Sequence, residues 1–559
     1  MRKRDPRAED RRWRICAVAL SAAVALCRIR PFFILSVIGL ALLSYGCATV
    51  GPDFRKPSAP VAKEWDEAKD PRARKEAADY SQWWTVFNDP VLDALIATAY
   101  KQNLDLQIAG IRILEARAQL GIAVGNQYPQ QQQLNASHSY TETSQNAANT
   151  TGGDLRYQAY TYALDAAWEL DFWGKFRRAV ESADANLIAS VANYDDVLVT
   201  LTSDVASTYT LIRTYEERLR VARENVAIQK SSYDLVEARY RNGAVTELDL
   251  QQARSLLYDT MSQISTLEIG YQDAKHSLST LLGMPPGDLQ DMLGDARPIP
   301  VAPADVVVGI PAELLRRRPD IRSAELQAAA QCALIGAAKA DLFPKISLTG
   351  SFGFLSSDSS LTRTGGSSFS DLFSWRSLTL ATGPSIQWPV LNYGRIQNNI
   401  RVQDARFQQL LVTYQNTVLR AAREVEDSLV SFLKSQDQAQ MLSESTLAAK
   451  RAVDLAMIQY REGATDYTRV LTAQQSLVQQ QDRLTQSRGT VASSLVTLYK
   501  ALGGGWQIRA DKGFVSEETI KAMRERTNWG RLLPVEAPSG GLEPPPPASR
   551  QKLLPRPDW

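Results

Sequence analysis

Two stretches of the chain, residues 175–242 and 395–462, contain neither glycine nor proline over 68 residues each. Glycine and proline are the residues that most readily interrupt a helix, so these stretches predict helices of unusual length. At a rise of about 1.5 Å per residue, 68 helical residues would extend for about 100 Å. A compact globular core does not need helices of that length. The sequence therefore predicts an elongated, mainly helical structure.

The chain also repeats itself. Three sets of residues recur 220 positions later: Tyr240-Arg-Asn-Gly-Ala as Tyr460-Arg-Glu-Gly-Ala, Trp168 as Trp388, and Leu282-Gly283 as Leu502-Gly503. Each copy is predicted to hold a helix (104–125 and 319–340), two strand-like segments, and two long helices joined at the Tyr-Arg-x-Gly-Ala turn. This self-similarity predicts two internal structural repeats, at 104–283 and 319–503, joined by a linker at 284–318.

The long helices carry a narrow apolar seam. In the first, the seam residues alternate at spacings of three and four: Leu198, Leu201, Val205, Thr208, Ile212, Tyr215, Leu219, Ala222 and Val226. The corresponding residues in the second copy are Val418, Ala421, Val425, Ser428, Phe432, Ser435, Ala439 and Leu442. This spacing predicts coiled-coil packing. Polar residues cover the other faces, as the wall of a water-filled tube requires. A periplasmic coiled-coil stalk is the alternative.

Four short segments alternate apolar and polar residues, as β-strands do. The apolar positions are Leu134, Ala136 and Tyr140; Tyr160, Tyr162, Leu164, Ala166, Trp168 and Leu170; Ile346, Leu348, Gly350, Phe352 and Phe354; and Leu378, Leu380, Ile386 and Trp388. Strands of about ten residues with one apolar face and flanking aromatics are typical of membrane β-barrels. A soluble sheet packed on a core would show the same alternation.

The number of strands bears on assembly. Four strands are too few to close a barrel, and open strand edges cannot lie in lipid. A dimer with eight strands or a trimer with twelve could close one, and the count alone does not choose between them. The polar segments 145–154 and 355–371, rich in Ser, Thr, Asn and Gly, are expected to be exposed hairpin tips.

The N-terminus predicts export and lipid attachment. Residues 31–46 form an apolar run that follows Arg28 and Arg30 and precedes Cys47. The run is short for a membrane-crossing helix and has the basic flank of a signal peptide, so 1–46 is expected to be a signal peptide with an unusual N-terminal extension. A cysteine at the cleavage point predicts a covalent lipid, such as palmitate, on Cys47. Ser44 stands where a leucine is usual, and an ordinary signal with an incidental cysteine is the alternative.

Composition excludes several functional classes. Residues 1–46 hold nine of the 63 Lys and Arg and three of the 61 Asp and Glu, which leaves 54 basic and 58 acidic side chains in residues 47–559. That balance offers no broad basic face for nucleic acid. His138, His276 and Cys332 form no metal-binding or catalytic pattern, and the common phosphate-loop, nucleophile-elbow and zinc-protease motifs are absent. We therefore expect no enzyme activity, no metal and no cofactor besides the lipid.

Together these features resemble the TolC family of outer-membrane efflux proteins, in its NodT-like lipoprotein branch that serves RND pumps. The residues that carry the resemblance are Cys47-Ala-Thr-Val-Gly51-Pro52-Asp53-Phe54, Trp83-Trp84, Asp204-Val205-Ala206, Glu424-Val425-Glu426-Asp427, the two Tyr-Arg-x-Gly-Ala turns and Leu502-Gly-Gly-Gly-Trp506. The resemblance implies a homotrimer whose twelve-stranded outer-membrane barrel continues into a long α-helical coiled-coil periplasmic tunnel. Segments 47–103 and 284–318 and the C-terminal portion would belong to a mixed equatorial region.

The resemblance also assigns roles at the helix tips. The tip turns, which would dock a periplasmic adaptor, contain Gly243, Ala244, Gly463 and Ala464. A hydrogen bond from Tyr460 to Asp249 would hold the inner helix pair closed; a packed tyrosine and a solvated aspartate are the alternative. Family members often place a ring of Asp at the constriction, where this sequence has Thr472, with Arg469 one turn earlier. An Arg469 ring would favour anions, and a solvated or salt-bridged arginine is the alternative.

The predicted function is a passive exit duct for small molecules, such as drugs, toxic compounds or metals. An inner-membrane RND transporter and a periplasmic adaptor (membrane fusion protein) would deliver them. The alternatives are the outer-membrane duct of a protein-secretion system and a periplasmic coiled-coil structural lipoprotein. The chain is expected in the cell outer membrane, lipid-anchored and extending into the periplasm. The Pro-rich segment 504–559 is expected to be partly disordered.

Overall fold

A computed structural model describes residues 49–533, apart from 68, 75, 77–78, 147, 149–153, 288, 310–316, 364 and 511. Its elements are β1 (Ala73–Arg74), η1 (Trp83–Phe87), α2 (Pro90–Gln102), α3 (Leu104–Gly125), β2 (Gln131–Glu142), β3 (Arg156–Glu169), α4 (Lys175–Arg241), α5 (Glu247–Leu281), α6 (Gln290–Leu293), β4 (Val306–Val307), α8 (Pro319–Ala340), β5 (Lys345–Ser357), η2 (Phe369–Asp371), η3 (Trp375–Ser377), β6 (Leu378–Gln387), α9 (Arg395–Arg461), α10 (Tyr467–Ala501), η4 (Trp506–Arg509) and α11 (Glu517–Arg526). The predicted signal peptide and Cys47 lie outside the described residues.

The described chain forms two compact units. One unit consists of residues 49–53, 123–181 and 333–403, and the other of residues 54–122, 182–332 and 404–533. The first unit contains all four long strands, and the second contains the two tips at which the long helices end. None of the helices in the described residues has the length and apolar character needed to cross a membrane.

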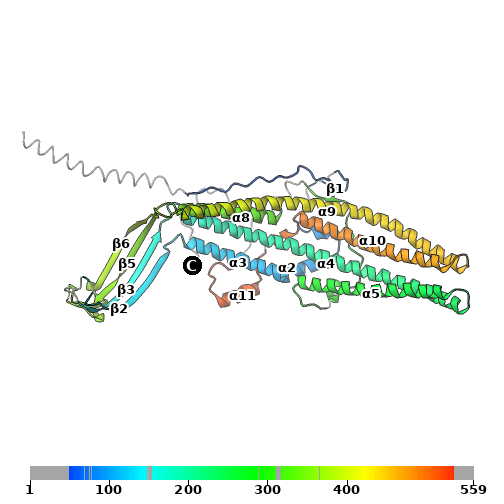
Figure 1. Ribbon diagram of the computed structural model, residues 1–559, viewed down its shortest axis with the longest axis horizontal. Coiled ribbons are helices and arrows are strands. Elements are labelled where there is room, and N and C mark those ends of the chain that lie inside the picture. Colours follow the sequence, from blue (N-terminus) through cyan, green and yellow to red (C-terminus); the bar gives the residue numbers. More distant parts are fainter. Residues whose placement is uncertain are drawn as a thin grey trace, which may run out of the picture. The chain divides into compact units, whose positions relative to one another are not determined.

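The four predicted strands form one antiparallel sheet in the order β2-β3-β5-β6 (Figure 1). Its register aligns Leu134 with Leu164, Leu164 with Phe352, and Phe352 with Leu380. Because alternate residues of a strand point to opposite faces, this row and its neighbours of the same parity make one apolar face. Asp165 and its cross-strand neighbours lie on the other, polar face. Within the described residues β2 and β6 each pair with one strand only, so both are open edges.

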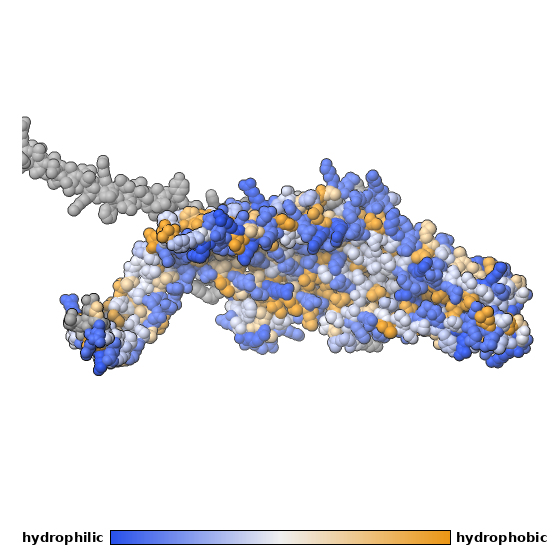
Figure 2. Space-filling view, viewed as in Figure 1, coloured by the Kyte–Doolittle hydropathy of each residue, from blue (hydrophilic) through white to orange (hydrophobic). Residues whose placement is uncertain are grey.

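The long helices were located correctly from glycine spacing. Helices α4 and α9 have 67 residues each, and α5 and α10 have 35 each. Gly174 and Gly394, with φ of 77° and 78°, directly precede α4 and α9. Every residue of the predicted seam in α4 and α9 is buried or half-buried. The seam is thus buried, as coiled-coil packing requires. The visible surface is mainly polar, with apolar side chains at separate points (Figure 2).

Aromatic residues hold the core of the helical unit. The rings of Trp83 and Tyr499 stack with their centroids 5.3 Å apart, and Trp84 packs edge-on against Trp83. Gly505, at φ 98°, allows the chain to pass close to both tryptophans, because an added Cβ would meet their side chains at 3.1 and 3.4 Å. The conformation at φ 98° also favours glycine itself.

The C-terminal segment, expected to be partly disordered, contains a short helix. Ser516 caps helix α11, and its side chain accepts a hydrogen bond from the backbone N–H of Thr519. Phe514, Met523 and Leu533 are buried in the main core. Residues 505–533 therefore pack on the helical unit, and residues 534–559 lie outside the described part.

Two glycines of α3 should respond in opposite ways to replacement by alanine. A Cβ on Gly110 would lie 2.1 Å from the carbonyl oxygen of Phe514, whereas a Cβ on Gly121 would meet nothing within 4 Å. We expect Gly110→Ala to destabilise the protein by about 1–3 kcal/mol through overpacking. Gly121→Ala should stabilise it by up to about 1 kcal/mol, since alanine is the better helix former. Thermal unfolding followed by circular dichroism checks this; equal melting temperatures for the two variants would contradict it.

Candidate functional site

The two helix tips share one turn design. At the first tip the N–H of Ala244 donates to the carbonyl of Arg239 at 2.9 Å, and the N–H of Gly243 donates to the carbonyl of Tyr240 at 2.9 Å. This pair of bonds is a Schellman motif, which ends a helix on a residue with positive φ. Gly243 has φ 72°, and Gly463 has φ 76° in the same motif at the second tip. Glycine is required here by backbone geometry.

The helices that follow the turns begin with side-chain caps. At α5, Thr246 and Asp249 form a capping box: the Asp249 carboxylate accepts from the backbone N–H of Thr246 at 3.0 Å and from its hydroxyl at 2.9 Å. At α10 the carboxylate of Asp466 accepts from the N–H of Arg469. Such caps satisfy donors that the first turn of a helix leaves unpaired. The turns between them stay exposed, including Gly243, Ala244, Gly463 and Ala464.

The two tips pack against each other through a small apolar cluster. Its buried members are Val236, Ala253, Tyr460, Tyr467 and Val470. The rings of Tyr460 and Tyr467 meet nearly edge to face, with centroids 5.5 Å apart. Because the cluster draws on α4, α5, α9 and α10, a movement of one hairpin relative to the other must disrupt it.

Arg239 of α4 joins the two hairpins directly. Its guanidinium donates to the backbone carbonyls of Tyr460 at 2.9 Å and of Arg461 at 2.8 Å, at the C-terminal end of α9. The guanidinium carbon also lies 4.5 Å from the centroid of the Tyr460 ring. A cation is favoured at a helix C-terminus and over an aromatic face. Arg239 was not identified from the sequence. The available signal was a difference between the two otherwise similar tips: the first has Arg239 where the second has Gln459.

Tyr460 and Asp249 are neighbours but are not bonded in this conformation. The Tyr460 side chain is 2% exposed, and its hydroxyl has no hydrogen-bonding partner among the described residues. The Asp249 carboxylate is instead occupied by the capping box. Burial raises the pKa of Tyr460, with Arg239 opposing and Asp249 adding to the shift. The phenol therefore keeps its proton at neutral pH and is an unused hydrogen-bond donor.

The two predicted constriction residues lie on the first turns of α10. Arg469 and Thr472 are both exposed. The Thr472 hydroxyl donates to the backbone carbonyl of Thr468 at 2.9 Å. Within the described residues the Arg469 side chain makes no ion pair, so its charge faces solvent in the single chain.

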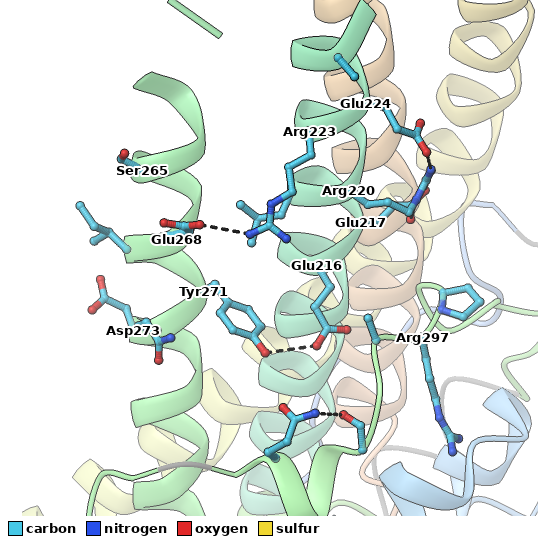
Figure 3. A pocket seen from close by; sticks show the side chains of 18 residues that line it. Glu216, Glu217, Arg220, Arg223, Glu224, Ser265, Glu268, Tyr271, Asp273 and Arg297 are labelled. Carbon is cyan, nitrogen blue, oxygen red and sulfur yellow. Dashed lines mark hydrogen bonds and ion pairs between the residues drawn. The ribbon is translucent and has the colours of Figure 1, made fainter. Parts of the chain in front are cut away.

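A groove of about 1410 Å³ lies along α4 and α5, near residues 290–298 (Figure 3). Its charged side chains largely neutralise one another: Arg223 pairs with Glu268 at 3.2 Å, and Arg220 pairs with Glu217 and Glu224. The Tyr271 hydroxyl donates to the Glu216 carboxylate at 3.4 Å (Figure 3). In the described part of the chain, no group of three or more His, Cys, Asp and Glu is placed to hold a metal ion. His138 and His276 are exposed, and Cys332 is buried.

Known proteins match this chain over most of its length. A family model described as outer membrane efflux protein matches residues 95–284 and again residues 310–504. Nodulation protein T of Rhizobium leguminosarum bv. trifolii is 31% identical over 488 residues, covering 86% of this chain and 98% of that protein. The probable outer membrane lipoprotein SilC of Salmonella typhimurium is 31% identical over 483 residues, covering 85% and 98%.

The fold is matched as well. The solved structure of the outer-membrane channel OprN superposes with a TM-score of 0.76 at 32% sequence identity, covering 82% of this chain and 100% of that one. The long helices and the four strands of the sheet thus belong to a known arrangement.

Proposed function

The chain belongs to the family of outer membrane efflux proteins, and on that premise we propose that three copies of it enclose one export channel. It is an outer-membrane protein of an efflux system and serves as a passive exit duct for small molecules. What we propose beyond this is the assembly, in which the three copies form a twelve-stranded barrel in the membrane and a helical tunnel in the periplasm. An RND transporter and a periplasmic adaptor would deliver the cargo, with the exposed tip turns as the docking site for the adaptor.

The observation that carries the proposal is the open-edged sheet. Its apolar face suits lipid, but the backbone groups along the outer edges of β2 and β6 have no partner strand in the described chain. Unpaired backbone groups cannot remain in a bilayer, so further strands must cover both edges. Pairing β6 of one copy with β2 of the next closes the sheet. The choice of three copies rests on the resemblance to TolC-family channels, which are homotrimers.

We also propose a lipid on Cys47. The residues just after it are fixed in the unit that holds the sheet: the N–H of Val50 donates to the carbonyl of Trp173 at 3.1 Å, and Asp53 pairs with Arg178 at 2.7 Å. Thr49 lies against Gly174, five residues beyond the end of β3. This position, where the strands give way to the long helices, suits an anchor in the periplasmic leaflet. The relative SilC is described as a lipoprotein.

The helix tips are the proposed gate. In the shut state the unused Tyr460 hydroxyl would donate to the Asp249 carboxylate, and Arg469 and Thr472 would line the constriction. Because Tyr460→Phe removes only this hydroxyl, we expect increased susceptibility of the cells to vancomycin and unchanged thermal stability of the protein. Tyr240→Phe, at the equivalent exposed position of the first tip, is the control and should change neither. Unchanged susceptibility with Tyr460→Phe would contradict the gate.

Conductance tests the channel itself. Purified full-length protein added to a planar lipid bilayer should produce discrete conductance steps. A coiled-coil structural lipoprotein would produce none, and that result would overturn the proposal. To separate efflux from protein secretion, a strain lacking the gene should become sensitive to small toxic compounds, while its secreted proteins should be unchanged. Loss of a secreted protein without that sensitivity would favour the secretion duct.

A further inference from the structure

The loop between β5 and β6, residues 358–377, folds back over the sheet. The Phe369 ring lies 5.2 Å from the ring of Tyr160 on β3, measured between centroids. The Phe373 ring lies 5.6 Å from Tyr162 and 5.7 Å from Phe354. Segment 355–371 was expected to be an exposed hairpin tip, and most of its described residues are indeed exposed or half-buried. The ring contacts with the strands were not predicted.

Backbone and hydroxyl contacts hold the loop in this position. The hydroxyl of Ser356 donates to the backbone carbonyl of Ser368 at 2.8 Å and lies 3.0 Å from the hydroxyl of Ser367. Ser356 is only 2% exposed although it lies near the end of a strand. The Ser377 hydroxyl donates to the carbonyl of Asp371 at 2.7 Å, which closes the loop at its other end.

The loop covers the apolar face of the sheet, not the polar one. Tyr162 pairs with Phe354, and Phe354 pairs with Leu378, so these residues share a face. Two positions further along each strand, the same face continues with Leu164, Phe352 and Leu380. The rings of Phe369 and Phe373 therefore lie on the apolar face, against residues of β3 and β5.

The loop leaves a large apolar surface uncovered. Phe369, Phe373 and Trp375 are 59%, 61% and 82% exposed, and Leu361 is 69% exposed. The adjacent Arg376 is exposed as well. Aromatic rings next to a cation are common where protein meets both the acyl chains and the charged headgroups of a bilayer. In water alone, exposing this many large apolar side chains on one loop is unfavourable.

We propose that residues 365–377 of this loop form a lipid anchor in the outer leaflet. Phe369, Phe373 and Trp375 enter the interfacial layer, and Arg376 faces the phosphate groups of the surrounding lipids. Lipid is the occupant because the patch continues the face of the sheet that lipid already covers in the barrel. The inference thus rests on the proposed function. The loop lies at the end of the strands away from the long helices, which assigns it to the outer leaflet.

The test places a fluorophore at Ser370→Cys, between the anchoring rings, in the full-length protein reconstituted into phosphatidylcholine–phosphatidylglycerol vesicles. Leu380→Cys reports on the apolar face of the strands and Thr349→Cys on the polar face. Lipids brominated on the acyl chain near the headgroup should quench the label at 370, and lipids brominated deeper should quench the label at 380. Iodide in the water should quench the label at 349 and spare the label at 370.

The outcomes separate the two proposals. If iodide quenches the label at 370 while brominated lipid quenches the label at 380, the anchor is wrong and the barrel stands. If brominated lipid fails to quench the label at 380, the barrel itself is wrong. With the anchor correct, adding Phe369→Ser and Phe373→Ser should abolish lipid quenching at 370 and leave that at 380 unchanged. Persistent lipid quenching at 370 in this variant would show that the rings do not hold the loop in lipid.

Discussion

Replacing Asp195 with asparagine is expected to lower the free energy of unfolding by about 3–5 kcal/mol, the usual cost of removing one partner from a buried ion pair. Asp195 and Arg509 are 2% and 8% exposed, and the Arg509 guanidinium donates to both carboxylate oxygens. Burial alone would lower the pKa of Arg509, but the bonds and charge of Asp195 more than offset it, so the pKa is raised. Burial also raises the pKa of Asp195, although the bonds and charge of Arg509 oppose that shift. The loss of stability on Asp195→Asn comes from the arginine, which has no neutral form available near neutral pH. The cation therefore remains buried when its partner is lost.

The neighbouring residue, Asp196, provides a matched control, because its replacement should change the free energy of unfolding in the opposite direction. Burial, with a contribution from Asp320, raises the pKa of Asp196 to about 6, despite the opposing charges of Arg318 and Lys500. Above pH 6 the folded protein holds an ionised carboxylate that burial disfavours. Asp196→Asn should therefore raise the free energy of unfolding by about 2–3 kcal/mol at pH 7.

The pH dependence of that control follows from the same shift. The folded-state pKa lies above the unfolded value of 3.8, so between pH 4 and 6 the folded protein binds more protons than the unfolded one. The contribution of Asp196 to stability therefore falls as the pH rises through this window. Urea unfolding at pH 4, 5 and 7 should show an Asp196→Asn advantage that is absent at pH 4 and full at pH 7. Stabilisation by Asp195→Asn, or the same advantage of Asp196→Asn at every pH, would contradict this account.

Periodic and local features of this protein could be predicted from its sequence. The absence of glycine and proline marked α4 and α9, and apolar alternation marked β2, β3, β5 and β6. Both signals act over a few residues, through backbone freedom and the direction of successive side chains. The tip turns were found for the same reason, because Gly243 and Gly463 end their helices by local hydrogen bonds.

Contacts between distant residues could not be predicted. Asp195 and Arg509 are 314 positions apart, and nothing in the pattern of α4 shows which of its acids meets that arginine. Arg239 meets the end of α9 from 221 positions away. The Tyr460–Asp249 bond, inferred from resemblance, involves two residues that the structure brings near each other without bonding. The loop after β5 is placed by ring contacts of Phe369 and Phe373 with Tyr160 and Tyr162 of β3, which lies far earlier in the sequence.

An arginine at position 352 should prevent assembly of the protein in the outer membrane. Phe352 is 47% exposed on the apolar face of the sheet, in the row formed with Leu164 and Leu380. If that face meets lipid, Phe352→Arg places a charge in the hydrocarbon layer at a cost of about 2–4 kcal/mol in each copy near the midplane. The cost recurs in every subunit of the barrel, so the loss of assembled protein should be nearly complete.

Thr349→Arg, in the same strand, is the matched control for this variant. Thr349 is exposed on the polar face, where its hydroxyl donates to the backbone carbonyl of Gly383 at 3.3 Å. There an arginine would face the water-filled interior, and assembly should persist. Heat-modifiable oligomer in isolated outer membranes, detected by gel electrophoresis without boiling, measures both variants. Normal assembly of Phe352→Arg would mean that the apolar face does not contact lipid.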